Sequence, residues 1–165
     1  MAGADQIIYN LDTSALITLE AFYPADVFPP VWDKLDELLG NKRAYFIEEV
    51  YIEVQRRDDA VAQWLKRRRS YGMKNQTQDD FLQAQGVISN HPGLVDINAT
   101  QTGADPFVIA DSIRCGSVVV TREEKVGVGA KRPKIPNVCE AYKVRCIHGQ
   151  YYATEFFREN GWTFT

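Results

Sequence analysis

The sequence predicts a single three-layer α/β domain with a mainly parallel sheet, formed by 165 residues. Short apolar runs rich in β-branched residues alternate with longer segments in which apolar residues recur three and four positions apart. The run SVVVT at 117–121 has a continuous apolar centre, which is typical of a parallel strand covered on both faces. Strands that alternate with helices favour a sheet with helices on both sides.

The first half of the chain alternates strand and helix patterns. The run at 6–11 is short, apolar and partly β-branched, as expected of a buried strand. A helix should lie between Pro30, which fits a first helical turn, and Gly40, which fits a helix end. Residues 44–58 indicate a strand that runs into a helix. The other helices expected in this half cover residues 14–23, 59–72 and 77–89.

The second half continues the alternation. Residues 93–98, GLVDIN, predict a short strand. Asp105 before Pro106 predicts the start of a helix, with Asp105 as the cap and Pro106 in the first turn. Residues 125–138 are basic and rich in Gly and Pro, which predicts an exposed loop. A last strand is expected at 144–147 and a terminal helix at 151–160.

Composition sets limits on the function. Hydrophobic residues make up 45% of the chain and charged residues 25%, as in globular proteins, and the net charge of −3 gives no overall basic signature for nucleic acid. The N-terminus resembles no signal peptide and no apolar stretch reaches membrane-spanning length, so we expect a cytoplasmic protein. Three cysteines without a CxxC pair agree with a reducing compartment. A zinc site from Cys139, Cys146 and His148 is the weaker alternative, because their spacing matches no common ligand pattern.

Three acidic residues should meet at one edge of the predicted sheet. Asp12 follows the first strand, Glu123 follows the 117–121 run, and Asp105 opens the helix that leads into that run. In open parallel sheets the functional crevice lies outside the carboxyl ends of the strands. Clustered acids raise each other's pKa values unless a cation neutralises them, and such hard oxygen ligands suit Mg²⁺ or Mn²⁺. A metal held in this way can generate hydroxide and stabilise charge on a phosphodiester.

Each acid taken alone also has a structural interpretation. Asp12 fits the cap of the helix that begins near Ser14, and Asp105 before Pro106 is a good cap on its own. Glu123 fits a solvated loop residue. Only the joint placement of the three at strand ends favours a functional role.

Several motifs resemble a known family. LDTSALI, ADPFVIADS and VVVTREE resemble, in that order, the acidic motifs of PIN-domain nucleases, the family that includes VapC-type toxins. FPPVWDKLDELL, EEVYIEV, DPFVIA and KIPNVCEAY are similar, in this order, to one PIN-like subfamily. The resemblance covers about 7–147 and leaves 148–165 as an aromatic C-terminal extension of a single PIN-like domain, 1–165. It implies the three-layer α/β/α sandwich already expected.

The resemblance also implies roles for individual residues. Asp12 matches the first-strand aspartate that binds metal, and Ser14 matches the hydroxyl that supports it. Asp105 matches the third acid and Glu123 the fourth, with Thr121 as the hydroxyl before it. Asp12, Asp105 and Glu123 are thus the expected metal ligands.

Two of the four acids need further comment. The second acid should lie on the helix after residue 47, where Glu53 fits the family spacing best and Glu49 is the alternative. The fourth acid is usually Asp in this family, whereas here it is Glu123 with Glu124 beside it, which leaves the metal geometry and the number of ions open. Asp111 sits away from the Asp105 face of its helix and is not included.

The resemblance implies a hydrolase, an endoribonuclease that cuts single-stranded RNA with Mg²⁺ or Mn²⁺. It also implies the toxin of a toxin–antitoxin pair, with an antitoxin protein as partner and a homodimer as the common state. A haloacid-dehalogenase-type phosphatase is disfavoured, because Ser14 stands where that chemistry needs a second aspartate. A non-catalytic PIN-like module that binds RNA or protein is the alternative.

Two basic segments supply candidate phosphate contacts. The first is the run of arginines at 67–69, and the second is the loop that follows the fourth acid. Basic residues close to the site favour phosphate contacts, although a basic helix face is equally compatible with simple solvation. The candidate RNA-binding residues are Arg67, Arg68, Arg69, Lys131 and Arg132, and the same loop also carries Lys125 and Lys134.

Overall fold

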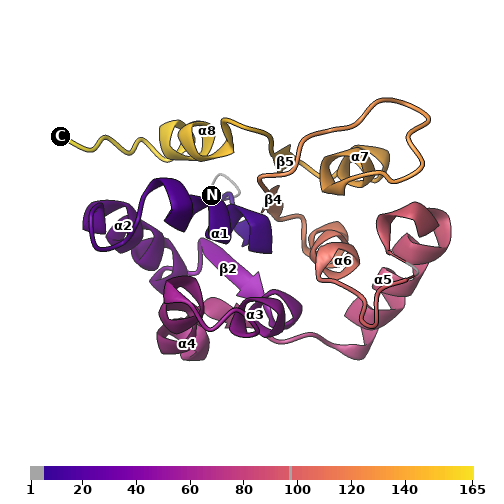
Figure 1. Ribbon diagram of the computed structural model, residues 1–165, viewed down its shortest axis with the longest axis horizontal. Helices are drawn as coiled ribbons and strands as arrows, with labels where there is room; N and C mark the ends of the chain where they lie inside the picture. Colours follow the sequence, from indigo (N-terminus) through magenta and orange to yellow (C-terminus); the bar gives the residue numbers. More distant parts are fainter. Residues whose placement is uncertain (1–5, 97) are drawn as a thin grey trace, which may run out of the picture.

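The computed structural model describes residues 6–96 and 98–165, which form a parallel sheet between two groups of helices (Figure 1). The strand order is β3-β2-β1-β4-β5, and every pair of neighbouring strands is parallel. The predicted three-layer α/β class is therefore confirmed. The strands are β1 (Tyr9–Leu11), β2 (Ala44–Ile47), β3 (Met73–Lys74), β4 (Val118–Val120) and β5 (Cys146–Ile147).

The helices cover the two faces of the sheet unequally. One contiguous group contains α1 (Thr13–Phe22), α2 (Pro29–Gly40), α3 (Glu48–Gln55), α4 (Ala60–Gly72) and α8 (Tyr152–Glu159). The other contains α5 (Gln78–Asn90), α6 (Asp105–Cys115) and α7 (Ile135–Ala141). A short 3-10 helix, η1 (Pro92–Leu94), follows α5.

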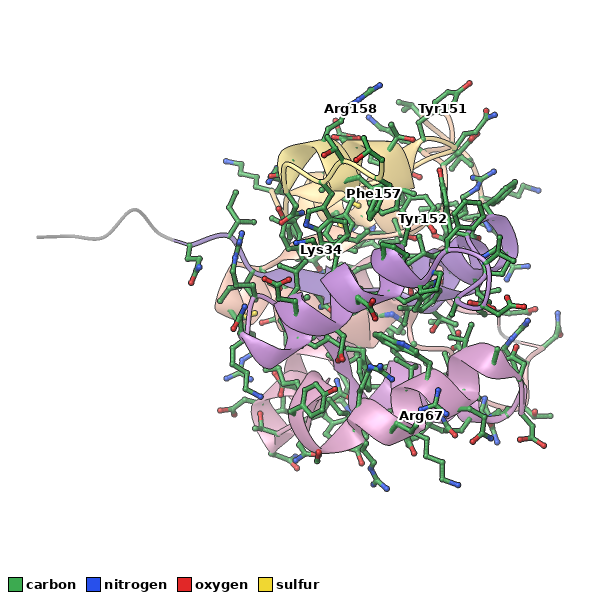
Figure 2. The ribbon with its side chains drawn as sticks, turned by 90° about the vertical axis from the view of Figure 1, so that its left-hand side faces the viewer. Lys34, Arg67, Tyr151, Tyr152, Phe157 and Arg158 are labelled. Carbon is green, nitrogen blue, oxygen red and sulfur yellow. The ribbon has the colours of Figure 1, made fainter. Side chains whose placement is uncertain are left out.

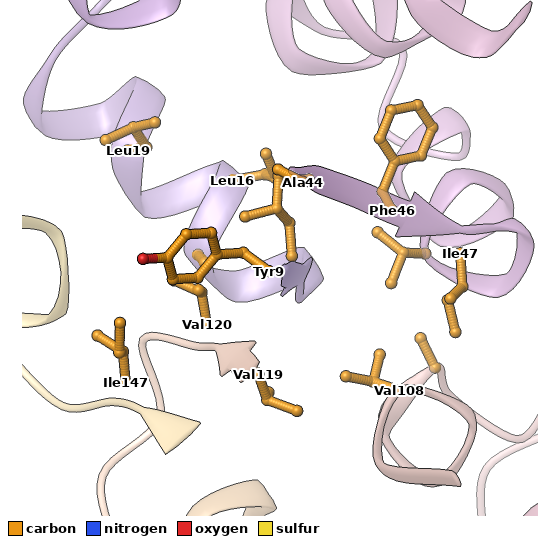
Figure 3. Close-up of a cluster of buried hydrophobic side chains, with 14 of the residues drawn as sticks. Tyr9, Leu16, Leu19, Ala44, Phe46, Ile47, Val108, Val119, Val120 and Ile147 are labelled. Atoms are coloured by element: carbon orange, nitrogen blue, oxygen red, sulfur yellow. The ribbon is translucent and has the colours of Figure 1, made fainter. Parts of the chain in front are cut away.

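Strand β1 shows why the sheet is buried on both faces. Side chains of successive strand residues point to opposite faces. Tyr9 faces the first helix group, where its ring centroid lies 4.9 Å from that of Phe156 in α8. Asn10 faces the second, where its Nδ2 donates to the backbone oxygen of Val108 in α6 at 3.1 Å. Figure 3 shows the apolar side chains that pack around these central strands.

The strand predicted at 93–98 is wrong for the residues that the structure describes, and one strand of the sheet was not predicted. Pro92 and Gly93 begin the 3-10 helix η1, and the described residues of the expected strand at 93–98 form no strand; Ile97 lies outside the described residues. The strand that was not predicted is β3, which forms one edge of the sheet, pairs with β2 and is only two residues long. A strand this short, directly after an amphipathic helix, gives no period of its own in the sequence.

The predicted loop at 125–138 ends earlier than expected, because α7 starts at Ile135. Pro136 lies in the first helical turn, where proline loses no intrahelical hydrogen bond, and Ile135 and Val138 are buried. The Gly- and Pro-rich composition predicts a loop along the whole segment, because Pro136 gives the same signal inside a first helical turn as it does in a loop. Only residues 125–134 lack helical structure.

The aromatic C-terminal segment packs on the domain. The Tyr152 hydroxyl donates to the backbone oxygen of Ala15 in α1, and the ring of Phe157 stacks on that of Trp162 with centroids 5.5 Å apart. Figure 2 shows Tyr152 and Phe157 directed from α8 toward the body of the protein. Residues 152–162 are therefore part of the fold.

Candidate functional site

Asp12 lies at the carboxyl end of β1 with one carboxylate oxygen free. Its Oδ2 accepts hydrogen bonds from Ser14 Oγ at 2.7 Å and Thr121 Oγ1 at 2.8 Å, whereas its buried Oδ1 has no partner. The side chain is 2% exposed. Asp12 occupies the N-cap position of α1, yet its side chain makes no cap hydrogen bond. Helix capping therefore does not explain this carboxylate.

The two hydroxyl residues join the ends of β1 and β4 around Asp12. The backbone N–H of Asp12 donates to the Val120 oxygen at 2.9 Å. Ser14 Oγ accepts from the backbone N–H of Arg122 at 3.0 Å, and Thr121 Oγ1 accepts from that of Glu123 at 3.2 Å. Both hydroxyls are thus oriented to donate to Asp12, which fixes the direction of its carboxylate.

Asp105 is the first residue of α6 rather than its cap, which corrects the predicted role. Ala104 holds the N-cap position, and no side chain of α6 caps the helix. The Ala104 N–H instead donates to Glu53 Oε2 of α3 at 2.9 Å. A residue distant in sequence thus fixes the start of α6 and places Asp105 at the carboxyl edge of the sheet.

Glu123 makes the equivalent contact to a second helix. Its Oε2 accepts from the backbone N–H of Ile135, the first residue of α7, at 2.8 Å. Its backbone oxygen accepts from Gly149 N at 2.8 Å. Glu53 and Glu123 each engage one carboxylate oxygen in this way. Negative charge at a helix start is favourable, so both contacts stabilise the chain segments that border the site.

Burial raises the pKa of Asp12 to about 6. Repulsion from Glu123 and Glu53 raises the pKa further, while the hydrogen bonds from Ser14 and Thr121 lower it. The balance shows that the ionised form of Asp12 is destabilised in the folded protein.

Burial also raises the pKa of Asp105, to about 8, and repulsion from Asp12, Glu123 and Glu53 adds to this rise. The nearby charge of Lys134 lowers the pKa. Glu53 and Glu123 thus act on the pKa of both buried aspartates, and we call Asp12, Glu53, Asp105 and Glu123 the acid cluster.

The acid cluster does not form a closed ligand set. Within residues 6–96 and 98–165, no three His, Cys, Asp or Glu side chains converge closely enough to hold one metal ion. Cys139, Cys146 and His148 are among the described residues, so they do not converge on a zinc site in this structure either. Of the two candidates for the second acid, Glu53 repels Asp12 and Asp105, whereas the pKa of Glu49 is raised by its own burial and then by Glu48.

The arginines of α4 are largely engaged within the protein. Arg68 donates from Nε to Asp36 at 2.9 Å, and its guanidinium lies 4.0 Å from the Trp64 ring centroid. Arg69 lies over the Tyr51 ring at 5.0 Å. Arg67 is exposed and points away from the body of the protein (Figure 2).

The loop at 125–134 brings positive charge to the acids. Lys131, Arg132 and Lys134 are exposed, and Arg132 lies 3.6 Å from Asp96. Lys134 acts directly on the pKa of Asp105. Its position next to Ile135, whose N–H binds Glu123, explains this proximity. No sequence signal distinguished Lys134 from the other basic residues of the loop.

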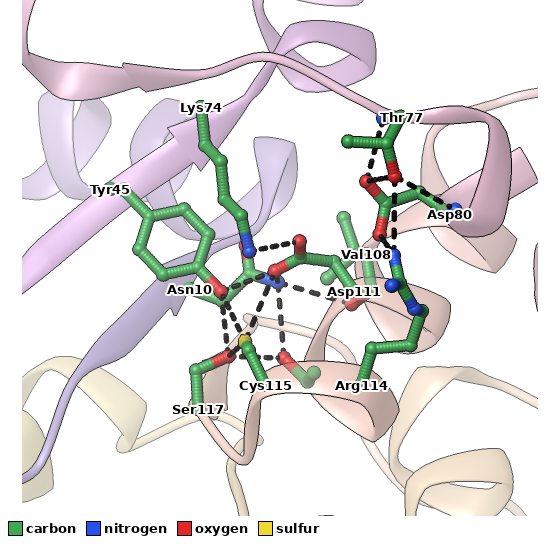
Figure 4. Close-up of polar contacts among 11 residues, drawn as sticks. Asn10, Tyr45, Lys74, Thr77, Asp80, Val108, Asp111, Arg114, Cys115 and Ser117 are labelled. Carbon is green, nitrogen blue, oxygen red and sulfur yellow. Dashed lines mark hydrogen bonds and ion pairs between the residues drawn. The ribbon is translucent and has the colours of Figure 1, made fainter.

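Asp111 belongs to a separate polar network at the far end of α6 (Figure 4). It is 1% exposed, pairs with Lys74 of β3 at 2.6 Å and accepts from the Tyr45 hydroxyl. Asn10 donates to the same carboxylate at 3.4 Å. The network ties α6 to β3 and lies away from Asp105.

Comparison with known proteins gives one family and two structural likenesses. The sequence matches the family described as "Domain of unknown function (DUF4411)" over residues 9–164. No curated protein matches it. The fold is similar to VapBC2 from Rickettsia felis, a structure bound to a DNA fragment from their promoter, with a TM-score of 0.47, 14% identity, and coverage of 71% of this chain and 88% of that chain. It is also similar to PAE2754 from Pyrobaculum aerophilum, with a TM-score of 0.46, 17% identity, and coverage of 87% and 100%. At these values neither likeness identifies a function.

Proposed function

The chain belongs to the DUF4411 family, and we propose that it is a PIN-like, metal-dependent endoribonuclease that hydrolyses phosphodiester bonds of single-stranded RNA. One observation carries the proposal. The buried Asp12 carboxylate has an oxygen without a partner, and Glu53 and Glu123 repel the negative charge of both Asp12 and Asp105. Uncompensated buried charge is costly, and a divalent cation would neutralise it.

The donor set fits Mg²⁺ or Mn²⁺, because it consists of carboxylate oxygens. Asp12, Asp105 and Glu123 would hold the ion after their side chains rotate toward one another, because no three acids of the described residues converge on one point. Glu53 would add a fourth negative charge beside the ion. When bound, a divalent ion supplies hydroxide at neutral pH and stabilises charge on the phosphate. Since Glu53 and Glu123 each bond a backbone N–H, direct ligation requires their free oxygens or a rotation of their side chains.

The other residues of the site position these acids. Ser14 and Thr121 hold Oδ2 of Asp12, which leaves Oδ1 for a ligand. Glu53 fixes the start of α6 and hence the position of Asp105. Lys134 supplies a positive charge beside Asp105, which suits the phosphate of an incoming strand.

Within this proposal the protein is the toxin of a toxin–antitoxin pair. Its partners are the RNA substrate, an antitoxin protein and a second copy of the chain, and its compartment is the cytoplasm. Among the residues that the structure describes, no helix has the length and apolar character to cross a membrane.

A second function is favoured by a specific observation. No three acidic side chains converge on one point within the described residues, which fits a PIN-like module that binds RNA or protein without cutting it. A phosphatase of the haloacid-dehalogenase type has no such support, because Ser14 bonds Asp12 where a second aspartate would be needed.

A cleavage assay separates the two functions. We expect the protein to cut a labelled single-stranded RNA with Mg²⁺ or Mn²⁺, to stop in EDTA, and to regain activity when excess metal is restored. RNA binding without any cleavage at either metal would instead identify the binding module.

Replacing Glu123 by Gln should lower cleavage by about 10–100-fold, as for loss of a group that supports a metal. Gln keeps an acceptor for Ile135 N but removes the charge. Glu123→Asp should keep part of the activity with a changed preference between Mn²⁺ and Mg²⁺, because the shorter arm changes the reach to the ion. Steady-state rates with each metal measure both effects. Glu124→Gln is the matched control, because the exposed Glu124 side chain lies 3.6 Å from Arg122. Loss of cleavage in Glu124→Gln but not in Glu123→Gln would identify Glu124 as the fourth acid.

Neutralising the exposed loop residues Lys131 and Lys134 to Gln should weaken RNA binding and flatten its salt dependence. Each lost phosphate contact lowers the slope of log affinity against log salt by roughly 0.7 for a single strand. The pair Arg67→Gln and Arg69→Gln should give a smaller change, because the α4 arginine face is partly committed within the protein. Lys34→Gln on α2 is the control. An unchanged slope for the loop variant would mean that this loop is only solvated.

A further inference from the structure

A cavity of about 270 Å³ adjoins the acid cluster. Asp105 and Pro106 at the start of α6 form one wall, the segment after α5 forms another, and residues 132–134 form the third. This volume lies below the range of about 300–1,000 Å³ that holds drug-sized ligands. The cavity therefore suits one ring system rather than a length of polynucleotide.

Gly93 holds the two loops that form this cavity close together. A Cβ at this position would overlap the backbone oxygen of Lys131 and lie 3.0 Å from Cδ of Pro133. Any side chain here would push the two segments apart. The cavity thus depends on a close backbone approach that glycine alone allows.

The polar groups of the cavity combine acceptors with donors. Asp96 and Arg132 lie 3.6 Å apart, and Gln101 and Lys134 add an amide and an ammonium group. Oδ1 of Asp96 already accepts from the backbone N–H of Asn98 at 3.0 Å, so the carboxylate is held in place. A carboxylate beside a guanidinium matches a ligand that presents neighbouring donors and acceptors.

Guanine is the nucleobase with this pattern. Its N1–H and N2 amino group are adjacent donors that suit a carboxylate, and its O6 and N7 are acceptors that suit arginine. Bases of single-stranded RNA are free to be read at these edges. Adenine and the pyrimidines offer a carboxylate only one amino group or a single ring N–H.

We propose that this cavity receives the base of the nucleotide next to the phosphate that is cut, and that Asp96 and Arg132 select guanine there. The inference rests on the proposed ribonuclease function, because the cavity shares Asp105 with the acid cluster. A cavity of this kind makes the enzyme selective for one base at one position, and the rest of the strand binds through its phosphates.

The first test sequences the ends of products from a random single-stranded RNA cut with Mn²⁺. Wild-type protein should enrich guanine at one position beside the cut by 10-fold or more. Asp96→Asn should reduce that enrichment to under 3-fold, because the amide lacks the second acceptor. Gly93→Ala should also remove it. Gly86→Ala in α5, where a Cβ meets nothing within 4 Å, should keep it.

The second test measures binding in EDTA, without cleavage. Fluorescent pentanucleotides with guanine or adenine at the central position are titrated against wild type and Asp96→Asn. Tighter binding of the guanine oligonucleotide by wild type alone supports the cavity even if no cleavage is found, in which case only the ribonuclease function fails. Cleavage with a flat base profile, a preference for another base, or guanine enrichment that survives in Asp96→Asn overturns the cavity assignment and leaves the ribonuclease function standing.

Discussion

Replacing Asp12 by Asn should lower metal-dependent RNA cleavage by at least about 10³-fold, a loss of about 4 kcal/mol in transition-state stabilisation. The Asn oxygen can still accept from Ser14 and Thr121, which keeps the local geometry. Its amide nitrogen then replaces the free Oδ1, and an amide nitrogen is no ligand for Mg²⁺. The loss should therefore come from chemistry rather than from misfolding.

Thermal unfolding in EDTA checks this distinction. Removing a buried charge from the acid cluster relieves repulsion, so the Asp12→Asn variant should unfold at the same temperature as wild type or higher. Asp26→Asn, at an exposed position outside the cluster, is the matched control and should cut RNA normally. An Asp12→Asn protein that cuts at the wild-type rate would contradict the site assignment.

Replacing Asp105 by Asn should stabilise the metal-free protein at high pH. The pKa of Asp105 is raised to about 8 in the folded state from 3.8, so the folded state binds this proton more tightly than the unfolded state. The stability that the folded protein gains from this tighter proton binding is fully present below about pH 4 and is lost as pH rises through about 8. Wild type should thus lose stability over this window, and the variant should lose less. The difference at pH 9 should be about 2–5 kcal/mol.

Urea unfolding at pH 4, 6, 8 and 9 in EDTA measures this difference. At pH 4 the two proteins should have nearly equal free energies of unfolding, since Asp105 is then protonated in the folded state. Asp79→Asn in α5, which is exposed, should follow the wild-type curve at every pH. Parallel curves for wild type and Asp105→Asn would show that Asp105 carries no uncompensated charge.

The sequence predicts the position of Asp12 because it depends on a local pattern, whereas Thr121 is singled out by the family resemblance. Each residue directly follows a short buried strand, Asp12 after β1 and Thr121 after β4, and neighbouring parallel strands bring their carboxyl ends to one edge. The pairing of Asp12 N with Val120 O realises that expectation. The hydrogen bond from Thr121 Oγ1 to Asp12 Oδ2 at 2.8 Å joins the two residues at this edge, and their role in the site stays a prediction.

The start of α6 shows where local patterns fail. Asp105 before Pro106 has the local signature of a cap, yet the backbone N–H at the helix start is satisfied by Glu53, which is 51 residues away in sequence. Long-range contacts of this kind produce no periodic pattern in the sequence. Arg68 is a second residue whose role the local sequence does not show. It donates to Asp36 and lies over the Trp64 ring, so it contributes to packing as well as to surface charge.

Manganese soaked into crystals of the protein tests the central claim most directly. The account predicts an anomalous difference peak between the carboxylates of Asp12 and Asp105, with Oδ1 of Asp12 among the ligands and no peak in the Asp12→Asn crystal. An acid cluster that stays free of manganese at millimolar concentration, with Glu53 and Glu123 still bonded to Ala104 N and Ile135 N, would contradict it.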